Sequence, residues 1–208
     1  MNYMNRMDLL KSLINKRLMV IDGAMGTAIQ DRNLTADDFG GTVYEGCNEH
    51  LIITRPDIIS SIHESYLDAG ADIIETNTFG ATSIVLDEYG LAHKSRQINF
   101  KAAEIARKLA DSFSSKQKPR FVAGSMGPTT KTISVTGGIT FDSLVESYQE
   151  QAAGLIEGGV DVLLLETSQD TINVKAGLIG IHRAFNEVGK SIHIAIQGTI
   201  ESMGTLLA

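Results

Sequence analysis

The chain has 208 residues, 43% of them hydrophobic and 21% charged, a composition typical of a globular protein and not of a disordered or fibrous one. Its net charge is -7 and its basic residues form no stripe, so we expect no nucleic-acid partner. No apolar run approaches the roughly 20 residues that a membrane span needs, so we expect no membrane partner.

The predicted elements begin with a helix and continue as strands that alternate with helices. Residues 1–17 mix charged residues with helical spacing and lack the apolar core of a signal peptide, which predicts a helix and a cytoplasmic protein. Short apolar runs follow, typical of strands covered on both faces. The predicted strands are Leu18–Ile21, Ile73–Thr76, Phe121–Ala123, Val162–Glu166 and Ile192–Gln197.

Helical patterns lie between these strands. Pro56 near a first turn and Gly70 after the last periodic residue bound one helix, with apolar residues three and four apart between them. The other helices are predicted over residues 99–112, 140–158 and 170–188. Strands that alternate with helices in this way predict βαβ units and a parallel sheet.

A weak internal repeat relates two of these units. Residues 69–76, AGADIIET, resemble residues 158–167, GGVDVLLLET. The second copy has two extra strand residues, which is one full period of a strand, so both Glu-Thr pairs are predicted to face the same way. The repeat can also arise because αβ loops and strand ends often look alike. It favours a barrel over an open sheet only mildly, because both are built from βα units.

Polar residues and glycines follow the predicted strands. Enzymes with this architecture carry their chemistry at the carboxyl ends of the strands. Here those ends are rich in carboxylates and carboxamides, and in glycines that let a ligand approach the backbone. They are residues 22–27 (DGAMGT), 75–79 (ETNTF), 124–129 (GSMGPT), 166–167 (ET) and 197–199 (QGT).

The residues at these ends predict a small zwitterionic ligand. Two carboxylates aimed at one cleft, Asp22 and Glu166, would suit an ammonium group, and backbone amides of residues 23–26 would suit a carboxylate. Together they indicate an α-amino acid. Taken singly the signals stay open, because Asp22-Gly23 also suits a turn and Asn77 a local backbone cap.

Other reactive residue types favour structural roles. No two of the five histidines have the spacing of a helical zinc pair, and we expect them at the surface or the core edge. Cys47, the only cysteine, has no basic neighbour in the sequence to lower its pKa, so we predict a plain loop thiol. Lys131 suits either a phosphate contact or a solvated loop, and the loop is favoured.

Five stretches of the chain carry a recognisable family pattern. They are IDGAMGTAIQ, GCNEHLIITRPDIISSIHESYLDAGADIIETNTFGAT, GSMGPTTKT, ITFDSLVESYQEQAAGLIEGGVDVLLLETSQDTINVKA and QGTI. In this order they resemble the homocysteine S-methyltransferase family, above all the amino-terminal homocysteine-binding modules of cobalamin-dependent methionine synthases. Betaine-homocysteine methyltransferases share the broader pattern. The resemblance extends from about Leu18 to Leu206, almost the whole chain.

The resemblance implies a TIM barrel in which three cysteine thiolates hold a zinc ion that binds the homocysteine sulfur. Zinc deprotonates a thiol whose pKa is ordinarily about 8.5 and presents it to a methyl donor. The implied donor is methylcobalamin, recharged from methyltetrahydrofolate, and the implied partners are homocysteine and folate- and cobalamin-binding modules. By position, the implied substrate-binding residues are Asp22, Gly23, Ala24, Met25, Asn77, Thr78, Phe79 and Glu166.

The sequence departs from the family at the metal site. The family's zinc cysteines lie on later strands, all beyond Ala208, and Cys47 matches none of them. The resemblance therefore places no catalytic residue, metal ligand or bound cofactor within residues 1–208. A TIM barrel typically needs about 250 residues. We expect one domain of about five βα units, an incomplete (β/α)8 barrel truncated before closure and without the helix that should follow the fifth strand.

The leading hypothesis is a homocysteine methyltransferase of the methionine synthase type whose isolated segment is inactive. One alternative is a noncatalytic amino-acid-binding fragment. Another is a different TIM-barrel enzyme, such as a lyase that binds a phosphorylated substrate through Lys131. Betaine, methylcobalamin and S-methylmethionine all stay open as methyl donors, and the overall similarity favours methylcobalamin.

Overall fold

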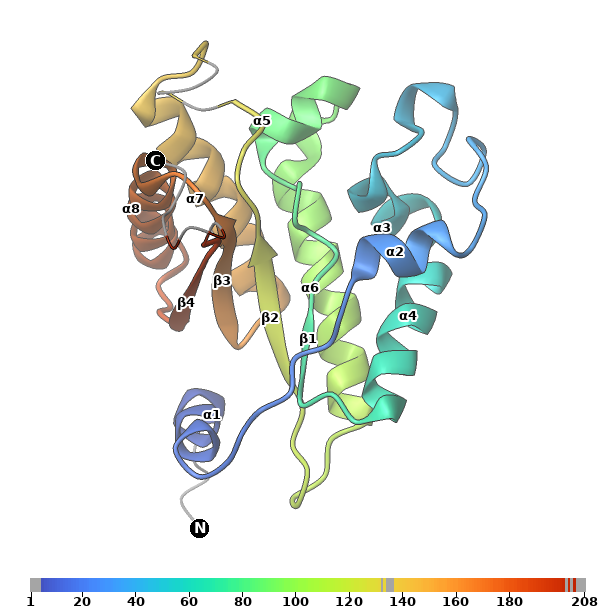
Figure 1. The fold of residues 1–208 in the computed structure, drawn as a ribbon, viewed down its shortest axis with the longest axis vertical. Helices are drawn as coiled ribbons and strands as arrows, with labels where there is room; N and C mark the ends of the chain where they lie inside the picture. Colours follow the sequence, from blue (N-terminus) through green and yellow to red (C-terminus); the bar gives the residue numbers. More distant parts are fainter. Residues whose placement is uncertain (1–4, 132, 134–136, 201, 203, 205–208) are drawn as a thin grey trace.

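A four-stranded parallel sheet forms the centre of the part of the chain that the structure describes. The computed structural model describes residues 5–131, 133, 137–200, 202 and 204. Neighbours in the sheet follow chain order, β1-β2-β3-β4 (Figure 1). The strands are β1 (Ile73–Glu75), β2 (Phe121–Met126), β3 (Val162–Ser168) and β4 (His193–Gly198). The sheet confirms the predicted α/β class.

Long helices connect the strands and cover one face of the sheet, as Figure 1 shows, while the first helix lies near the sheet's lower end on the other side. The longer helices are α1 (Arg6–Ile14), α4 (Pro56–Ala69), α6 (Ser95–Ser112), α7 (Phe141–Gly158) and α8 (Thr171–Val188). Shorter elements are α2 (Met25–Gln30), α3 (Leu51–Thr54), α5 (Ser83–Leu86) and the 3-10 helices η1 (Thr42–Tyr44), η2 (Asn48–His50), η3 (Asp87–Tyr89) and η4 (Ala92–Lys94). No helix among the described residues is long and apolar enough to span a membrane.

The predicted helix boundaries agree with the capping residues. Gly70 ends α4 with a φ of 112°, a left-handed conformation that costs glycine little. Thr140 caps α7 by accepting a hydrogen bond from the Ser143 N–H, and Asp170 caps α8 in the same manner. Two helices differ from their predicted bounds: α6 begins at Ser95, four residues before the predicted start at Asn99, and α1 ends at Ile14, three residues before the predicted end at Arg17. The short helices were not predicted, because each is too short to show a period.

The predicted strand Leu18–Ile21 does not form. Ile21 makes one isolated parallel bridge with Ile73, and the Val20 carbonyl accepts hydrogen bonds from two N–H groups at the start of β1. The ladder goes no further in either direction because side-chain carboxylates take the next N–H groups: Asp72 accepts from Val20, and Asp22 accepts from Glu75. Leu18 is 92% exposed. The segment is therefore an extended edge of the sheet with little pairing of its own.

Side chains that alternate along each strand build two apolar layers. Ile74, Val122 and Leu163 point toward the helices and join the largest core cluster, with residues of α4, α6, α7 and α8. Their neighbours on the other face, including Ile73 and Phe121, pack against Leu10 of α1. The near-continuous apolar runs of the sequence follow from this two-sided burial.

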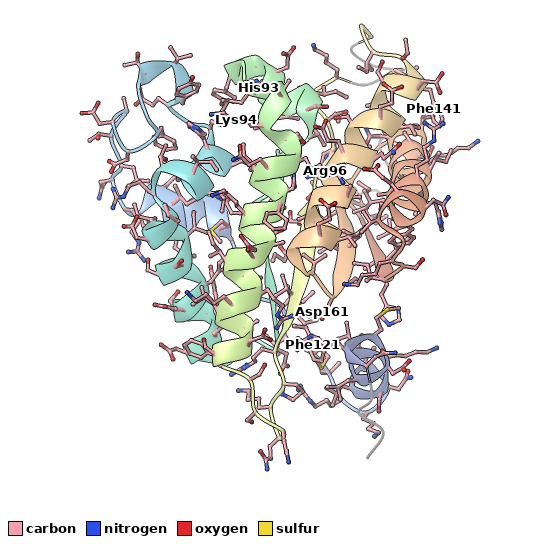
Figure 2. The ribbon with its side chains drawn as sticks, turned by 180° about the vertical axis from the view of Figure 1, so that it is seen from behind. His93, Lys94, Arg96, Phe121, Phe141 and Asp161 are labelled. Atoms are coloured by element: carbon pink, nitrogen blue, oxygen red, sulfur yellow. The ribbon has the colours of Figure 1, made fainter. Side chains whose placement is uncertain are left out.

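A buried carboxylate fixes the amino-terminal end of the sheet. Asp161, just before β3, accepts hydrogen bonds from the Arg6 and Arg107 guanidinium groups and from the Val122 N–H. It lies near Phe121 in Figure 2, between α6 and α1. Asp72, just before β1, repeats the arrangement with a two-pronged bond from Arg17. The two aspartates of the internal repeat thus bind α1 and its flanks to the sheet.

Replacing Asp161 with alanine is expected to lower the free energy of unfolding by about 3 kcal/mol, because two arginines lose a buried partner. Asp111 offers a matched control, since it contacts the same two arginines but its side chain is 57% exposed against 4% for Asp161. Asp111→Ala should cost under about 1 kcal/mol. Urea unfolding of both variants measures the difference, and equal losses would contradict the assigned role of Asp161.

One histidine is fully buried on α4. His63 has no hydrogen-bond partner for either ring nitrogen in the described structure. Burial lowers the pKa of His63 to about 4 from an ordinary value of 6.5. The prediction that the histidines lie at the surface or the core edge is therefore wrong for His63. This side chain lies in the interior, and its lowered pKa keeps it neutral there near pH 7.

The buried imidazole predicts acid sensitivity. Below pH 6.5 the unfolded chain binds a proton at His63 that the folded chain takes up only near pH 4, so stability falls as the pH drops through this window. Relative to His63→Leu, the parent chain should lose about 2 kcal/mol between pH 7 and pH 5. The same substitution at exposed His93 (Figure 2) is the control. Urea unfolding at both pH values measures it, and an unchanged difference would refute the assignment.

Candidate functional site

A cleft of about 410 Å³ opens at the carboxyl ends of the strands. Its walls come from the loop before α2, from η2 and from the ends of β1, β2 and β3, where parallel strands bring polar side chains together. No lysine, arginine or histidine is among the described residues that line it. The lining residues are Asp22, Gly23, Ala24, Met25, Gly26, Asn48, Glu49, Glu75, Thr76, Asn77, Phe79, Ser125 and Glu166.

Asp22 is held by the backbone of the first strand. Its N–H donates to the Ile73 carbonyl at 2.9 Å, and its carboxylate oxygens accept the Glu75 N–H at 3.0 and 3.1 Å. Burial, followed by the charge of Glu75, raises the pKa of Asp22 to about 8, even though the bond from the Glu75 N–H opposes the rise. Without a cationic ligand, Asp22 is therefore largely protonated at neutral pH.

Two glutamates complete the acidic wall. Glu75 ends β1, and burial together with the charge of Glu166 raises its pKa to about 7. Glu166 on β3 accepts a hydrogen bond from the Ser125 hydroxyl, and burial raises its pKa despite that bond. Both Glu residues of the internal repeat thus line the same cleft, as predicted from the period of the strand.

A fourth carboxylate comes from the loop before α3. Glu49 accepts the Gly80 N–H at 2.8 Å, and burial raises its pKa. Beside it, the Asn77 side chain donates to the Asn48 carbonyl at 2.8 Å. Asn77 therefore joins the loop after β1 to η2, and its amide nitrogen is already engaged by the protein.

The loop after β2 presses closely on the rim of the cleft. The Gly127 N–H donates to the Phe79 carbonyl, and a Cβ on Gly127 would lie 2.7 Å from that oxygen. Only glycine allows this approach, which fixes the backbone of Phe79, a residue 43% exposed at the rim.

Thr167, directly after Glu166, has a φ of 53°, an uncommon conformation for a β-branched residue.

Most of the residues named from the sequence meet in this cleft. Asp22, Gly23, Ala24, Met25, Asn77, Phe79 and Glu166 line it. Thr78 does not, because its side chain is fully buried and its hydroxyl donates to the Ser125 carbonyl at 2.7 Å. Lys131 lines a different pocket, beside Ser143 and Glu146.

Sequence reasoning missed five residues of the cleft, Asn48, Glu49, Glu75, Thr76 and Ser125. Glu75 carried a usable signal, since it matches Glu166 in the internal repeat, and Ser125 stood among the polar residues at the strand ends. Asn48 and Glu49 carried none, because their place depends on a loop that folds back over β1. No periodic pattern records such a contact.

The described residues do not fit the zinc site that the resemblance implies. Such a site needs three thiolates. Cys47 is buried among apolar residues, and burial raises the pKa of its thiol to about 12, so it is an inert thiol as predicted. Nor do the described residues contain a group of three or more His, Cys, Asp or Glu placed to hold a metal ion.

Comparison with known proteins identifies the family. The model of the homocysteine S-methyltransferase family matches residues 19–208. The chain is 44% identical over 200 residues to methionine synthase of Mycobacterium leprae and 44% identical over 198 residues to that of Mycobacterium tuberculosis. These matches cover 96% and 95% of the chain but only 16% of each relative. The chain belongs to the homocysteine S-methyltransferase family.

Solved structures share the fold. The metallated form of the homocysteine methyltransferase MmuM from Escherichia coli matches with a TM-score of 0.75 at 22% identity, over 95% of this chain and 69% of that one. Its oxidized form matches with a TM-score of 0.74 at 23% identity, over 95% and 70%. The described sheet and helices therefore have the arrangement of part of these proteins.

The Ser125 hydroxyl is expected to hold down the pKa of Glu166. Ser125→Ala removes the only hydrogen bond to that carboxylate among the described residues, so its pKa should rise further. Carbon-13 NMR of the side-chain carboxyls follows the titration. Ser112→Ala, on the exposed end of α6, is the control. An unchanged Glu166 titration in Ser125→Ala would show that the bond does not form in solution.

Proposed function

We propose that this chain is the homocysteine-binding part of a methyltransferase of the methionine synthase type. The proposal rests on the cleft, which lies within the part of the chain that the family model matches. Four carboxyl side chains line it, and no lysine, arginine or histidine is among its described lining residues. Such a cleft favours a ligand that brings a positive charge, since buried carboxylates repel one another until a cation or proton neutralises them.

Homocysteine offers groups that match the walls of the cleft. Its ammonium suits Asp22 and Glu166, which lie within mutual electrostatic reach. Its carboxylate suits the backbone amides of residues 23–25, which lead into α2. Asn77 and Phe79 would then border the rest of the ligand. Thr78 supports this wall from behind through its bond to Ser125.

We also propose that the sheet is one wall of a (β/α)8 barrel. Each strand lies beside the next in chain order, and right-handed crossovers that always step in one direction place the connecting helices α6, α7 and α8 on the same face. An open, doubly wound sheet would reverse its order and carry helices on both faces. Apolar side chains such as Val20 and Ile196 are exposed at opposite edges of the sheet, as expected where further strands would pair.

Methylation needs chemistry that the described residues do not supply. A thiol with a pKa of about 8.5 is mostly protonated at neutral pH, and zinc is the family's means of making the thiolate. The methionine synthase relatives are about six times the length of this chain. We therefore assign the zinc site, and the exchange of the methyl group with cobalamin and folate, to regions that such relatives have beyond the matched segment. By itself the chain would act as an amino-acid-binding unit. The alternative of a phosphate-substrate lyase loses support, because Lys131 is outside the cleft.

Glu166→Gln is expected to weaken homocysteine binding about tenfold to a hundredfold, since a charged hydrogen bond to the ammonium is lost. Isothermal titration calorimetry of the chain with homocysteine measures the dissociation constant. Glu64→Gln, the same change on the exposed side of α4, should leave binding unaltered. No homocysteine binding by the parent chain, or equal binding by both variants, would refute the proposed function.

A further inference from the structure

Glu75 differs from the other carboxylates of the cleft. Asp22, Glu49 and Glu166 each accept a hydrogen bond from the protein. No hydrogen bond or ion pair reaches the Glu75 carboxylate from the described residues, although Glu75 is only partly exposed and lines the cleft. The Glu75 carboxylate is thus available to accept hydrogen bonds from a ligand.

Among the described residues that line the cleft, every other ionisable side chain near Glu75 is acidic. Asp22 lies before α2, Glu49 on η2 and Glu166 on β3. The Tyr66 hydroxyl of α4 also approaches this wall, 3.2 Å from where a Cβ on Gly23 would be. A compensating charge must therefore come from bound protons or from a ligand.

We propose that Glu75 is a further substrate-binding residue, and that the ammonium of homocysteine replaces a proton that Asp22, Glu75 and Glu166 share in the free protein. The inference rests on the proposed function, since it concerns the same cleft. The charges balance. The ligand keeps its ammonium charge and the carboxyl proton goes to solvent, so one positive charge on the three carboxyls is exchanged for another. Glu75 positions the ammonium and takes part in no bond-making step.

The titration behaviour of the three carboxyls supports this exchange. Burial is the largest cause of each raised pKa, and the pKa of Asp22 is raised to about 8 and that of Glu75 to about 7. Groups coupled this closely titrate as a set, so the shared proton belongs to all three and not to one residue. Near neutral pH the set therefore holds at least one proton.

The exchange makes binding depend on pH with a definite sign. Below about pH 7, where the set is protonated, each homocysteine must release a proton, so affinity rises as the pH rises. If one proton leaves, the dissociation constant falls up to tenfold per pH unit. Above about pH 8 the set has already lost its proton, and this dependence ends.

Calorimetry in buffers of different ionisation enthalpy counts the released protons. At about pH 6.5 we expect close to one proton released per homocysteine, and none when 4-sulfanylbutanoate, which lacks the amino group, is the titrant. Glu75→Gln should release clearly less, lose most of the pH dependence and bind homocysteine about tenfold more weakly at pH 8. Glu104→Gln, on the exposed side of α6, should behave like the parent. Unchanged proton release in Glu75→Gln would overturn the proposal.

Carbon-13 NMR titration of the ligand-free chain separates this proposal from the proposed function. We expect the signal lost in Glu75→Gln to titrate near pH 7 in the parent and not near its ordinary value of 4.5. Homocysteine binding combined with titration near 4.5 would overturn the proton exchange alone. Titration near 7 without homocysteine binding would overturn the proposed function, and the exchange with it.

Discussion

The Asp161 carboxylate, enclosed by two arginines and a backbone N–H, is the interaction on which the arrangement of the sheet depends. It joins α1, α6 and the neighbouring strand β2 at the start of β3. Its guanidinium partners neutralise this buried charge, so removing either side of the pair would leave an uncompensated charge and destabilise the fold. The equivalent bond from Arg17 to Asp72 lowers the pKa of that aspartate and repeats the device at β1. With the amino-terminal ends fixed, the register decides which residues meet at the other end.

The carboxyl ends of the strands show the opposite electrostatics. There, Asp22, Glu75 and Glu166 are partly buried without a basic partner among the described residues, and their pKa values are all raised. The amino-terminal ends of the strands hold paired charges, whereas the carboxyl ends hold carboxylates that repel one another. Such an unneutralised site is prepared for a cation, which is the property that a binding site for an α-amino acid needs.

The division of chemistry within the family follows from the same layout. Residues that suit the ammonium and carboxylate of a substrate lie at the ends of β1 and β3 and before α2, within this chain. Its one thiol, Cys47, packs against Ala81, Leu86 and Leu91 and has a pKa too high for a thiolate. On the proposed function, recognition of an amino acid and activation of its sulfur would therefore be separable, and the described residues would provide for the first.

The sequence by itself determined the α/β class, four long helices with their caps, four of the strands and the family, because periodicity and capping residues act within a few positions. It also placed Asp22 and Glu166 at strand ends. Only the tertiary structure decided that Leu18–Ile21 pairs through a single bridge and forms no strand, that His63 is buried, that Thr78 faces the interior and that Glu49 and Glu75 join the cleft. Glu49 and Glu166 are over a hundred positions apart in the chain. The pKa values of such groups arise from burial and mutual repulsion in space, which no local pattern of residues encodes.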